Sequence, residues 1–121
     1  MTDSTQKFLI NCQDGFNNLE RATISFILAV TASKTAETAM FVTADATDLL
    51  IKNSVDGIAA DGHEPLADLM NAFLNNGGKI WLCPVCVKTK NIVETDLIDE
   101  VEIAGAPKTM AFLASGAKLL A

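Results

Sequence analysis

Gly77-Gly-Lys-Ile-Trp-Leu-Cys-Pro-Val-Cys-Val-Lys-Thr-Lys-Asn91 is a stretch in which a strand pattern passes directly into a helix pattern. Residues 79–83, Lys-Ile-Trp-Leu-Cys, predict a short strand. Pro84 suits the first position of a helix, because that position needs no backbone N–H donor. A strand followed at once by a helix is the unit from which parallel sheets are built, so this stretch favours an α/β fold.

Apolar runs and helix patterns also alternate upstream of this stretch. Residues 7–12 and 38–43 are short apolar runs that predict strands. A short helix is expected over 48–53, and a longer helix begins near Pro65 and ends in the turn Asn75-Asn-Gly-Gly78. The longer helix has one apolar face, made by Leu66, Leu69, Met70, Phe73 and Leu74. Met40, Met70 and Met110 are expected to fill the core.

A helix is also predicted between the first two strands. Asn17 and Glu20 are spaced as in a capping box, which predicts a helix over 18–32. Its segment Ala22-Thr-Ile-Ser-Phe-Ile-Leu-Ala-Val30 is apolar almost all round. Because such a helix is usually buried on more than one side, we expect the sheet to cover one side and a neighbouring subunit another.

The C-terminal part supplies the remaining elements. The pattern over 95–101 is ambiguous and fits one helical turn, and a short strand is expected over 101–103. A final helix over 107–114, stopped by a glycine, precedes a last strand over 118–121. Strands that alternate with helices pair in parallel, with helices on both faces of the sheet. We therefore predict a single domain over 1–121, a three-layer α/β/α sandwich with a mostly parallel sheet of about five strands.

The composition excludes several classes of protein. Half of the 121 residues are apolar and 20% are charged, which is typical of a folded domain rather than a disordered chain. Nine Lys and Arg stand against 15 Asp and Glu, and the formal charge of −6 argues against direct binding to nucleic acid. The longest apolar run, 26–30, is too short for a membrane span, and residues 1–5 lack the pattern of a signal peptide. We therefore expect a cytoplasmic protein whose three cysteines are reduced.

Cys83 and Cys86 form a Cys-x-x-Cys pair where the strand passes into the helix. Ligands of open parallel sheets bind at the carboxyl ends of the strands. The N-terminus of a helix favours a thiolate over a thiol. Pro84 begins the helix, and Lys88 and Lys90 add positive charge nearby. These residues predict thiolate chemistry at this pair.

Further side chains follow neighbouring strands and could share this edge of the sheet. Cys12 ends the first predicted strand and would lie near Cys83 if the two strands were neighbours, although a buried strand residue is its simpler interpretation. Asp14 and Asp45 follow the first and second strands and could line the same edge. Both are also ordinary turn and cap residues.

Three other interpretations of the cysteine pair remain open. The cysteines could pack in the core as small apolar side chains. They could be half of a zinc site, but only Cys12 and His63 remain as further ligands, so neither a metal nor another cofactor is predicted. They could form a dithiol oxidoreductase site, although the sequence offers no convincing candidate for the cis-proline loop of thioredoxin-like domains.

Several segments together resemble the DsrE/DsrF-like sulfur-relay family. They are the stretch 77–91, Asn18-Leu-Glu-Arg-Ala22, Val101-Glu-Ile-Ala-Gly-Ala-Pro107 and Gly116-Ala-Lys-Leu-Leu120. The resemblance implies a compact α/β/α domain that assembles into trimers or hexamers. It also implies a cysteine that carries sulfur as a persulfide between sulfurtransferases.

Residue by residue, the resemblance places the sulfur-carrying cysteine on Cys83. Cys86 matches a cysteine of only a subset of the family, and would act as a resolving thiol if it reaches Cys83. Where members often have Arg-Gly, Lys90 keeps the charge and Asn91 can adopt the left-handed conformation of a helix stop. The implied partners are an upstream sulfur donor protein and a downstream acceptor protein. A non-catalytic oligomeric scaffold or binding module stays open as the alternative, because some relay subunits lack the working cysteine.

Overall fold

Five short strands form one sheet in which every neighbouring pair is parallel, in the order β4-β3-β2-β1-β5. The computed structural model describes residues 6–120. Residues 1–5, where no signal peptide is expected, and Ala121, the last residue of the strand expected over 118–121, lie outside the described residues. The strands are β1 (Lys7–Cys12), β2 (Glu37–Val42), β3 (Lys79–Leu82), β4 (Val101–Ile103) and β5 (Lys118–Leu120). The α/β fold with a parallel sheet is confirmed.

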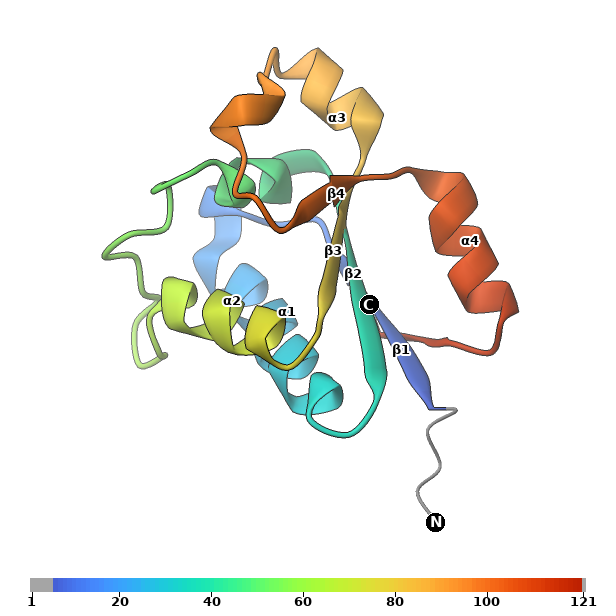
Figure 1. The fold of residues 1–121 in the computed structure, drawn as a ribbon. Helices are drawn as coiled ribbons and strands as arrows, with labels where there is room; N and C mark the ends of the chain where they lie inside the picture. Colours follow the sequence, from blue (N-terminus) through green and yellow to red (C-terminus); the bar gives the residue numbers. More distant parts are fainter. Residues whose placement is uncertain (1–5, 121) are drawn as a thin grey trace.

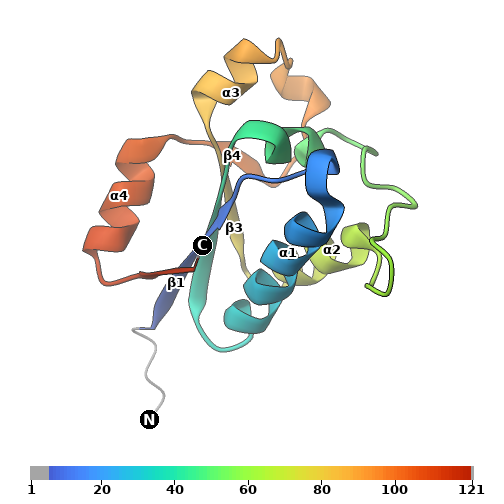
Figure 2. The ribbon, with the colours of Figure 1, turned by 180° about the vertical axis from the view of Figure 1, so that it is seen from behind.

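The helices lie on both faces of this sheet and beyond one of its edges (Figures 1 and 2). One face is covered by α1 (Leu19–Ser33) and α2 (Leu66–Asn75), and the opposite face by α4 (Ala106–Ala114). The short helix α3 (Pro84–Thr89) lies past the carboxyl end of β3. Three 3-10 helices complete the order, namely η1 (Phe16–Asn18), η2 (Ala44–Leu50) and η3 (Glu94–Asp96).

The main core lies between the sheet and the pair α1 and α2. Its largest fully buried side chains come from both layers and include Ile10, Met40, Ile80, Phe26 and Phe73. Burying one such side chain contributes roughly 1.5–3 kcal/mol, so this layer supplies most of the stability. Gly77, at φ 90°, makes the left-handed stop predicted after α2.

The opposite face has a smaller core under α4. Leu9, Ala39 and Trp81 are buried there, and the ring of Phe112 meets the ring of Trp81 edge-on at 5.3 Å. Met110 lies on the outer side of α4 and is 60% exposed, so its predicted place in the core is wrong. Met40 and Met70 are buried as predicted.

The first helix begins one residue later than its predicted cap. Asn18 is the N-cap of α1, and its side-chain oxygen accepts a hydrogen bond from the Arg21 N–H at 3.2 Å. The Asn17 side chain instead accepts from the Gly15 N–H and donates to Asp14. The Asn17–Glu20 capping box is therefore wrong, because the chain makes the 3-10 turn η1 before the helix starts.

Three apolar side chains of α1 stay at the surface of the single chain. Ala22, Phe26 and Ala29 are fully buried, whereas Ile24, Ile27 and Leu28 are between 36% and 44% exposed. The exposed three are spaced i, i+3 and i+4, so they form one continuous strip, called the α1 stripe here. A subunit contact on this stripe stays a prediction.

The helix expected over 48–53 is displaced toward the N-terminus. The 3-10 helix η2 starts at Ala44 and ends at Leu50, after which Ile51 turns to extended backbone. Ile51 forms an antiparallel bridge with Leu97, which removes it from the helix. None of the helices in the described part of the chain has the length and apolarity that a membrane crossing requires.

Candidate functional site

The two cysteines of the Cys-x-x-Cys pair lie at the carboxyl edge of the sheet. Cys83 directly follows β3, and its N–H donates to the Val42 carbonyl at 3.1 Å, which continues the pairing of β2 with β3. Cys83 is also the N-cap of α3, and Pro84 begins that helix as predicted. Both cysteines are half-buried and free. Strand pairing therefore fixes the backbone of Cys83 while its side chain stays accessible.

The sulfur of Cys86 contacts the loop that follows β2. Its Sγ accepts a hydrogen bond from the backbone N–H of Ala44, with the nitrogen and sulfur 3.3 Å apart. Ala44 is the first residue of η2 and has a φ of 53°, in the left-handed region that side chains other than glycine seldom adopt. The pair is thus attached to both β3 and the end of β2.

The loop that carries Ala44 packs against the loop after β1. A Cβ atom on Gly15 would lie 2.2 Å from the carbonyl oxygen of Asp45, so only glycine allows this approach. The Ala46 N–H also donates to the Gln13 carbonyl at 3.2 Å. The three loops after β1, β2 and β3 therefore meet at one edge, as the topology of a parallel sheet requires.

A fourth segment closes the other side of the site. Ala104 follows β4, and its N–H donates to the Leu82 carbonyl at 3.0 Å. A Cβ on Gly105 would come within 3.3 Å of the Pro84 ring. The connection to α4 thus packs closely on the start of α3.

The two lysines predicted to support the thiols differ in position. Lys90 Nζ lies 3.5 Å from the Asp48 carboxylate, so its charge joins α3 to η2. Lys88 is exposed in the last turn of α3. Asn91 has a φ of 55°, which confirms that it adopts the left-handed conformation expected after the helix.

Cys12, Asp14 and Asp45, which were predicted to line this edge, make contacts with residues other than Cys83 and Cys86. Cys12 is fully buried, and burial raises the pKa of its thiol to about 11. Its Sγ lies 3.7 Å from the Asp14 carbonyl, and the Asp14 carboxylate pairs with Arg21 at 3.3 Å. The Asp45 side chain is exposed, while its backbone packs against Gly15. The interpretation of Cys12 as a buried strand residue is confirmed.

His63, named above with Cys12 as a conceivable zinc ligand, faces a different residue. Its Nε2 lies 3.7 Å from a carboxylate oxygen of Glu20 at the start of α1. Within residues 6–120, no three His, Cys, Asp or Glu side chains are grouped closely enough to hold a metal ion.

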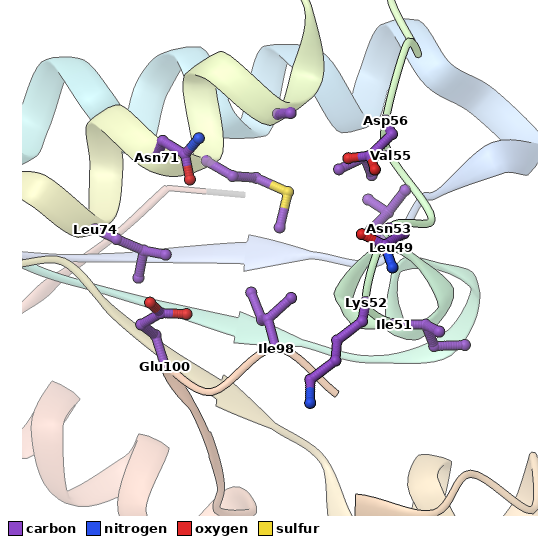
Figure 3. Close-up of a pocket in the computed structure, with 12 residues that line it drawn as sticks. Leu49, Ile51, Lys52, Asn53, Val55, Asp56, Asn71, Leu74, Ile98 and Glu100 are labelled. Atoms are coloured by element: carbon purple, nitrogen blue, oxygen red, sulfur yellow. The ribbon is translucent and has the colours of Figure 1, made fainter. Parts of the chain in front are cut away.

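A cavity of about 270 Å³ lies elsewhere, between α2 and the segments that follow η2 and precede β4 (Figure 3). Leu74 and Ile98 point into it from α2 and from the segment before β4, and Asn71 and Glu100 stand at its rim. No cysteine of the described chain lines it. The cavity is therefore separate from the thiol pair, and the sequence patterns gave no indication of it.

The patterns place the loops 13–18 and 44–47 at this edge of the sheet, but they did not predict the contacts that Gly15, Ala44 and Gly105 make there. Gly15 had a signal, because a glycine directly after a strand end marks a tight turn or a close approach of two backbones. Ala44 had none, since alanine has no preference for the left-handed region. Its contact with Cys86 spans 42 positions of sequence and depends on how two loops pack.

Comparisons with known proteins agree with this architecture. The family model of the DsrE/DsrF-like family matches residues 6–121. The uncharacterized protein MJ0760 of Methanocaldococcus jannaschii is 31% identical over 114 residues. The match covers 93% of this chain and 41% of that protein, so the chain spans about two-fifths of the length of this curated relative.

Solved structures with the same fold come from bacteria and archaea. The ychN protein from E. coli superimposes with a TM-score of 0.76 at 18% identity, over 95% of this chain and 99% of that one. MTH1491 from Methanobacterium thermoautotrophicum, a protein of unknown function, gives a TM-score of 0.67 at 8% identity, over 98% of both chains. The family model covers nearly the whole chain and these folds agree with it, so the protein belongs to the DsrE/DsrF-like family.

Proposed function

We propose that the protein is a sulfur carrier that holds sulfur as a persulfide on Cys83 and passes it from a donor protein to an acceptor protein. The observation that carries this proposal is a free, half-buried thiol at the carboxyl edge of a parallel sheet, in a member of the DsrE/DsrF-like family. Strand pairing holds the backbone at Cys83, so its sulfur is presented from a rigid position.

The transfer needs neither an oxidant nor a reductant. The Cys83 thiolate attacks the outer sulfur of a donor persulfide, the donor S–S bond breaks, and the donor leaves as a thiolate. A thiolate of the acceptor then attacks the outer sulfur on Cys83, which returns Cys83 to a thiolate. The rate of each step depends on the fraction of attacking thiolate and on access to the sulfur.

The surface next to Cys83 is accessible to such partners. Pro84 is exposed and Val85 is 67% exposed, both in the first turn of α3. Lys88 is exposed one turn further along α3. The acidic chain as a whole makes a protein partner a better fit than a nucleic acid.

We further infer that the protein acts in the cytoplasm as a single domain and as a homo-oligomer, a trimer or hexamer. The α1 stripe supports the oligomer, because apolar side chains in a continuous strip are commonly covered by another chain. The partners in transfer are the donor and acceptor proteins.

Mass spectrometry of the intact protein tests the carrier proposal. After a brief exposure to a small alkyl persulfide and removal of the excess, we expect Cys86→Ser to gain the mass of one sulfur atom, which peptide mapping then places on Cys83. The matched variants are Cys83→Ser, which loses this label, and Cys86→Ser, which keeps it. The absence of a label on Cys83 in Cys86→Ser, or a label that survives in Cys83→Ser alone, contradicts the proposal.

The Cys-x-x-Cys spacing favours one second candidate, a dithiol oxidoreductase. Both thiols are half-buried and within one turn of α3, so a reversible disulfide between them is sterically reasonable. This candidate predicts a disulfide with a definite reduction potential, measured in glutathione buffers, and little persulfide. A scaffold without reactive thiols predicts neither product and slow alkylation of both cysteines.

A further inference from the structure

Ala44 holds an unfavourable backbone conformation directly beside the thiol pair. Its backbone φ of 53° lies in the left-handed region. This region costs energy for most residues that have a Cβ, asparagine less than others, whereas glycine adopts it freely. Residues in such conformations persist where surrounding contacts over-determine them, and they gather at functional sites. The consequence of this conformation is that the Ala44 N–H points at Cys86 Sγ, 3.3 Å away.

Contacts on several sides keep η2, and with it Ala44, in this place. Gly15 packs without a Cβ against the Asp45 carbonyl, and Ala46 donates to Gln13. On the side of α3, the Asp48 carboxylate pairs with Lys90 at 3.5 Å. The N–H of Ala44 is therefore a fixed donor rather than part of a loop that adapts to Cys86.

Cys86 is well placed to reach the sulfur of Cys83. Cys83 caps α3, and Cys86 follows three residues later in the first turn. Side chains three positions apart at the start of a helix lie on the same side of it. Cys-x-x-Cys pairs at the start of a helix are also the arrangement in which disulfide oxidoreductases join the two sulfurs.

We propose that Cys86 resolves the persulfide on Cys83, with release of hydrosulfide, and that Ala44 is the residue that positions the Cys86 sulfur for this attack. The proposal rests on the carrier function, since it needs sulfur on Cys83. Cys86 attacks the inner sulfur, Sγ of Cys83, and a Cys83–Cys86 disulfide forms. The bond to the outer sulfur breaks, that SH group leaves as HS⁻, and the proton that Cys86 gives up on becoming a thiolate passes to the solvent.

The electrons of this step balance within the site. The transferred sulfur is reduced to sulfide, and the two cysteine sulfurs are oxidised to the disulfide. A dithiol reductant then returns the pair to thiols. The Ala44 N–H contributes by fixing the Cys86 sulfur before attack and by compensating the negative charge that develops there as its proton leaves.

The test loads the full chain with a small alkyl persulfide, removes the excess, and follows released HS⁻ and protein mass together. We expect the unchanged protein to release HS⁻ and to end as a Cys83–Cys86 disulfide. Cys86→Ser is expected to keep the extra sulfur on Cys83 and release little HS⁻. If the unchanged protein keeps its persulfide as long as Cys86→Ser does, Cys86 is not a resolving thiol, while the carrier function stands.

Ala44 is tested by a matched pair of substitutions at its exposed side chain. Gly adopts the left-handed region freely, whereas Val avoids it, so Ala44→Val withdraws the N–H from Cys86 and Ala44→Gly retains it. We expect Ala44→Val to release HS⁻ about tenfold more slowly than Ala44→Gly, the effect of one hydrogen bond to a charged group. Loading of Cys83 serves as the internal reference, because a general loss of structure slows both steps.

Equal ratios of release to loading in the two variants overturn the role of Ala44. Should Ala44→Val fail to fold in a thermal melt, the milder pair Ala44→Ser and Ala44→Asn makes the same comparison, since Asn tolerates the left-handed region. If no variant takes up sulfur on Cys83, the carrier function fails and the resolving step fails with it. That outcome is distinct from a stable persulfide, which removes the resolving step alone.

Discussion

At the scale of single residues, burial separates the cysteines into two kinds of thiol. Cys12 is fully enclosed under α1, and burial, the largest influence on it, raises the pKa of its thiol to about 11. Cys83 and Cys86 keep part of their surface exposed at the edge of the sheet. The reactive form of cysteine is the thiolate, so Cys12 is a packing residue at neutral pH.

Alkylation distinguishes these environments directly. In the native protein at about pH 8, we expect iodoacetamide to modify Cys83 and Cys86 and to leave Cys12 unmodified, because its sulfur is both buried and protonated. In denaturant all three cysteines should react alike. Peptide mapping by mass spectrometry gives the extent at each site, and early modification of Cys12 in the native protein would contradict this prediction.

The raised pKa of Cys12 also makes stability depend on alkaline pH. Below pH 9.0 the thiol is protonated in both states, so its burial contributes fully to the free energy of unfolding. As pH rises from 9.0 through about 11, the unfolded thiol ionises while the folded one does not, and stability is lost. We expect a loss of about 2–3 kcal/mol above that range.

Cys12→Ala should remove most of this decrease of the free energy of unfolding with rising pH, and Cys86→Ala should keep the decrease. Urea unfolding at a series of alkaline pH values measures the difference. Identical slopes for the two variants would contradict the assignment of the slope to Cys12.

Single residues were predictable from the sequence where local rules decide them. The positions of Cys83, Pro84 and Cys86 between strand and helix, and the left-handed Asn91, follow from neighbours along the chain. Ala44 could not be predicted, because its conformation results from the packing of the loops after three strands.

At the scale of elements, the periods of apolar residues predicted the strands and the four α-helices, while details at the helix starts were wrong. Asn17 and Asn18 are adjacent residues of the same type, and the turn η1 decides which one caps α1. The end of η2 is decided by the bridge between Ile51 and Leu97, a contact between distant segments. Local propensity does not contain either tertiary contact.

The contact between Gly15 and η2 gives a prediction at this scale. Gly15→Ala would place a Cβ 2.2 Å from the Asp45 carbonyl oxygen, so a backbone segment must move. We expect a loss of about 1–3 kcal/mol in the free energy of unfolding. The displaced η2 should also change the rate at which Cys86 is alkylated, because Ala44 moves with it.

Gly57→Ala is the matched control for this substitution. Gly57 has open space around its missing Cβ but a φ of 74°, so its replacement costs about 1 kcal/mol through the backbone alone. In Gly57→Ala, the rate at which Cys86 is alkylated should equal the rate in the unchanged protein. Equal rates in Gly15→Ala would show that η2 does not depend on this close approach.

At the scale of the whole molecule, the main feature is that exposed apolar side chains are distributed unevenly over the surface. The α1 stripe exposes Ile24, Ile27 and Leu28 together, whereas the other large exposed apolar side chains of residues 6–120, such as Met110, lie apart from one another along the chain.

The five parallel strands and their helices were predictable from the chain, but the order of the strands in the sheet was not. Parallel strands of similar apolar sequence have no local signal for their neighbours.

We expect the protein to sediment as a homo-oligomer that depends on the α1 stripe. Replacing Ile24 and Leu28 together by Asp places charge in the proposed contact and should shift the protein to monomers in analytical ultracentrifugation. Met110→Asp, on the exposed side of α4, adds a charge elsewhere and should keep the oligomer. A monomer of the unchanged protein at high concentration would contradict the prediction.

The pairing of β5 with β1 sets the order in which the sheet can be completed. Phe8, near the start of the chain, has Lys118 as its partner across the strands, so this side of β1 stays open until the last strand has been synthesised. Contacts between such distant residues form slowly, because the intervening chain must be ordered first. During translation β1 therefore presents unpaired N–H and C=O groups along one edge, which is a template for other nascent chains. The short strand β5 thus protects the finished protein from aggregation, and the interval before it arrives is the period of greatest risk.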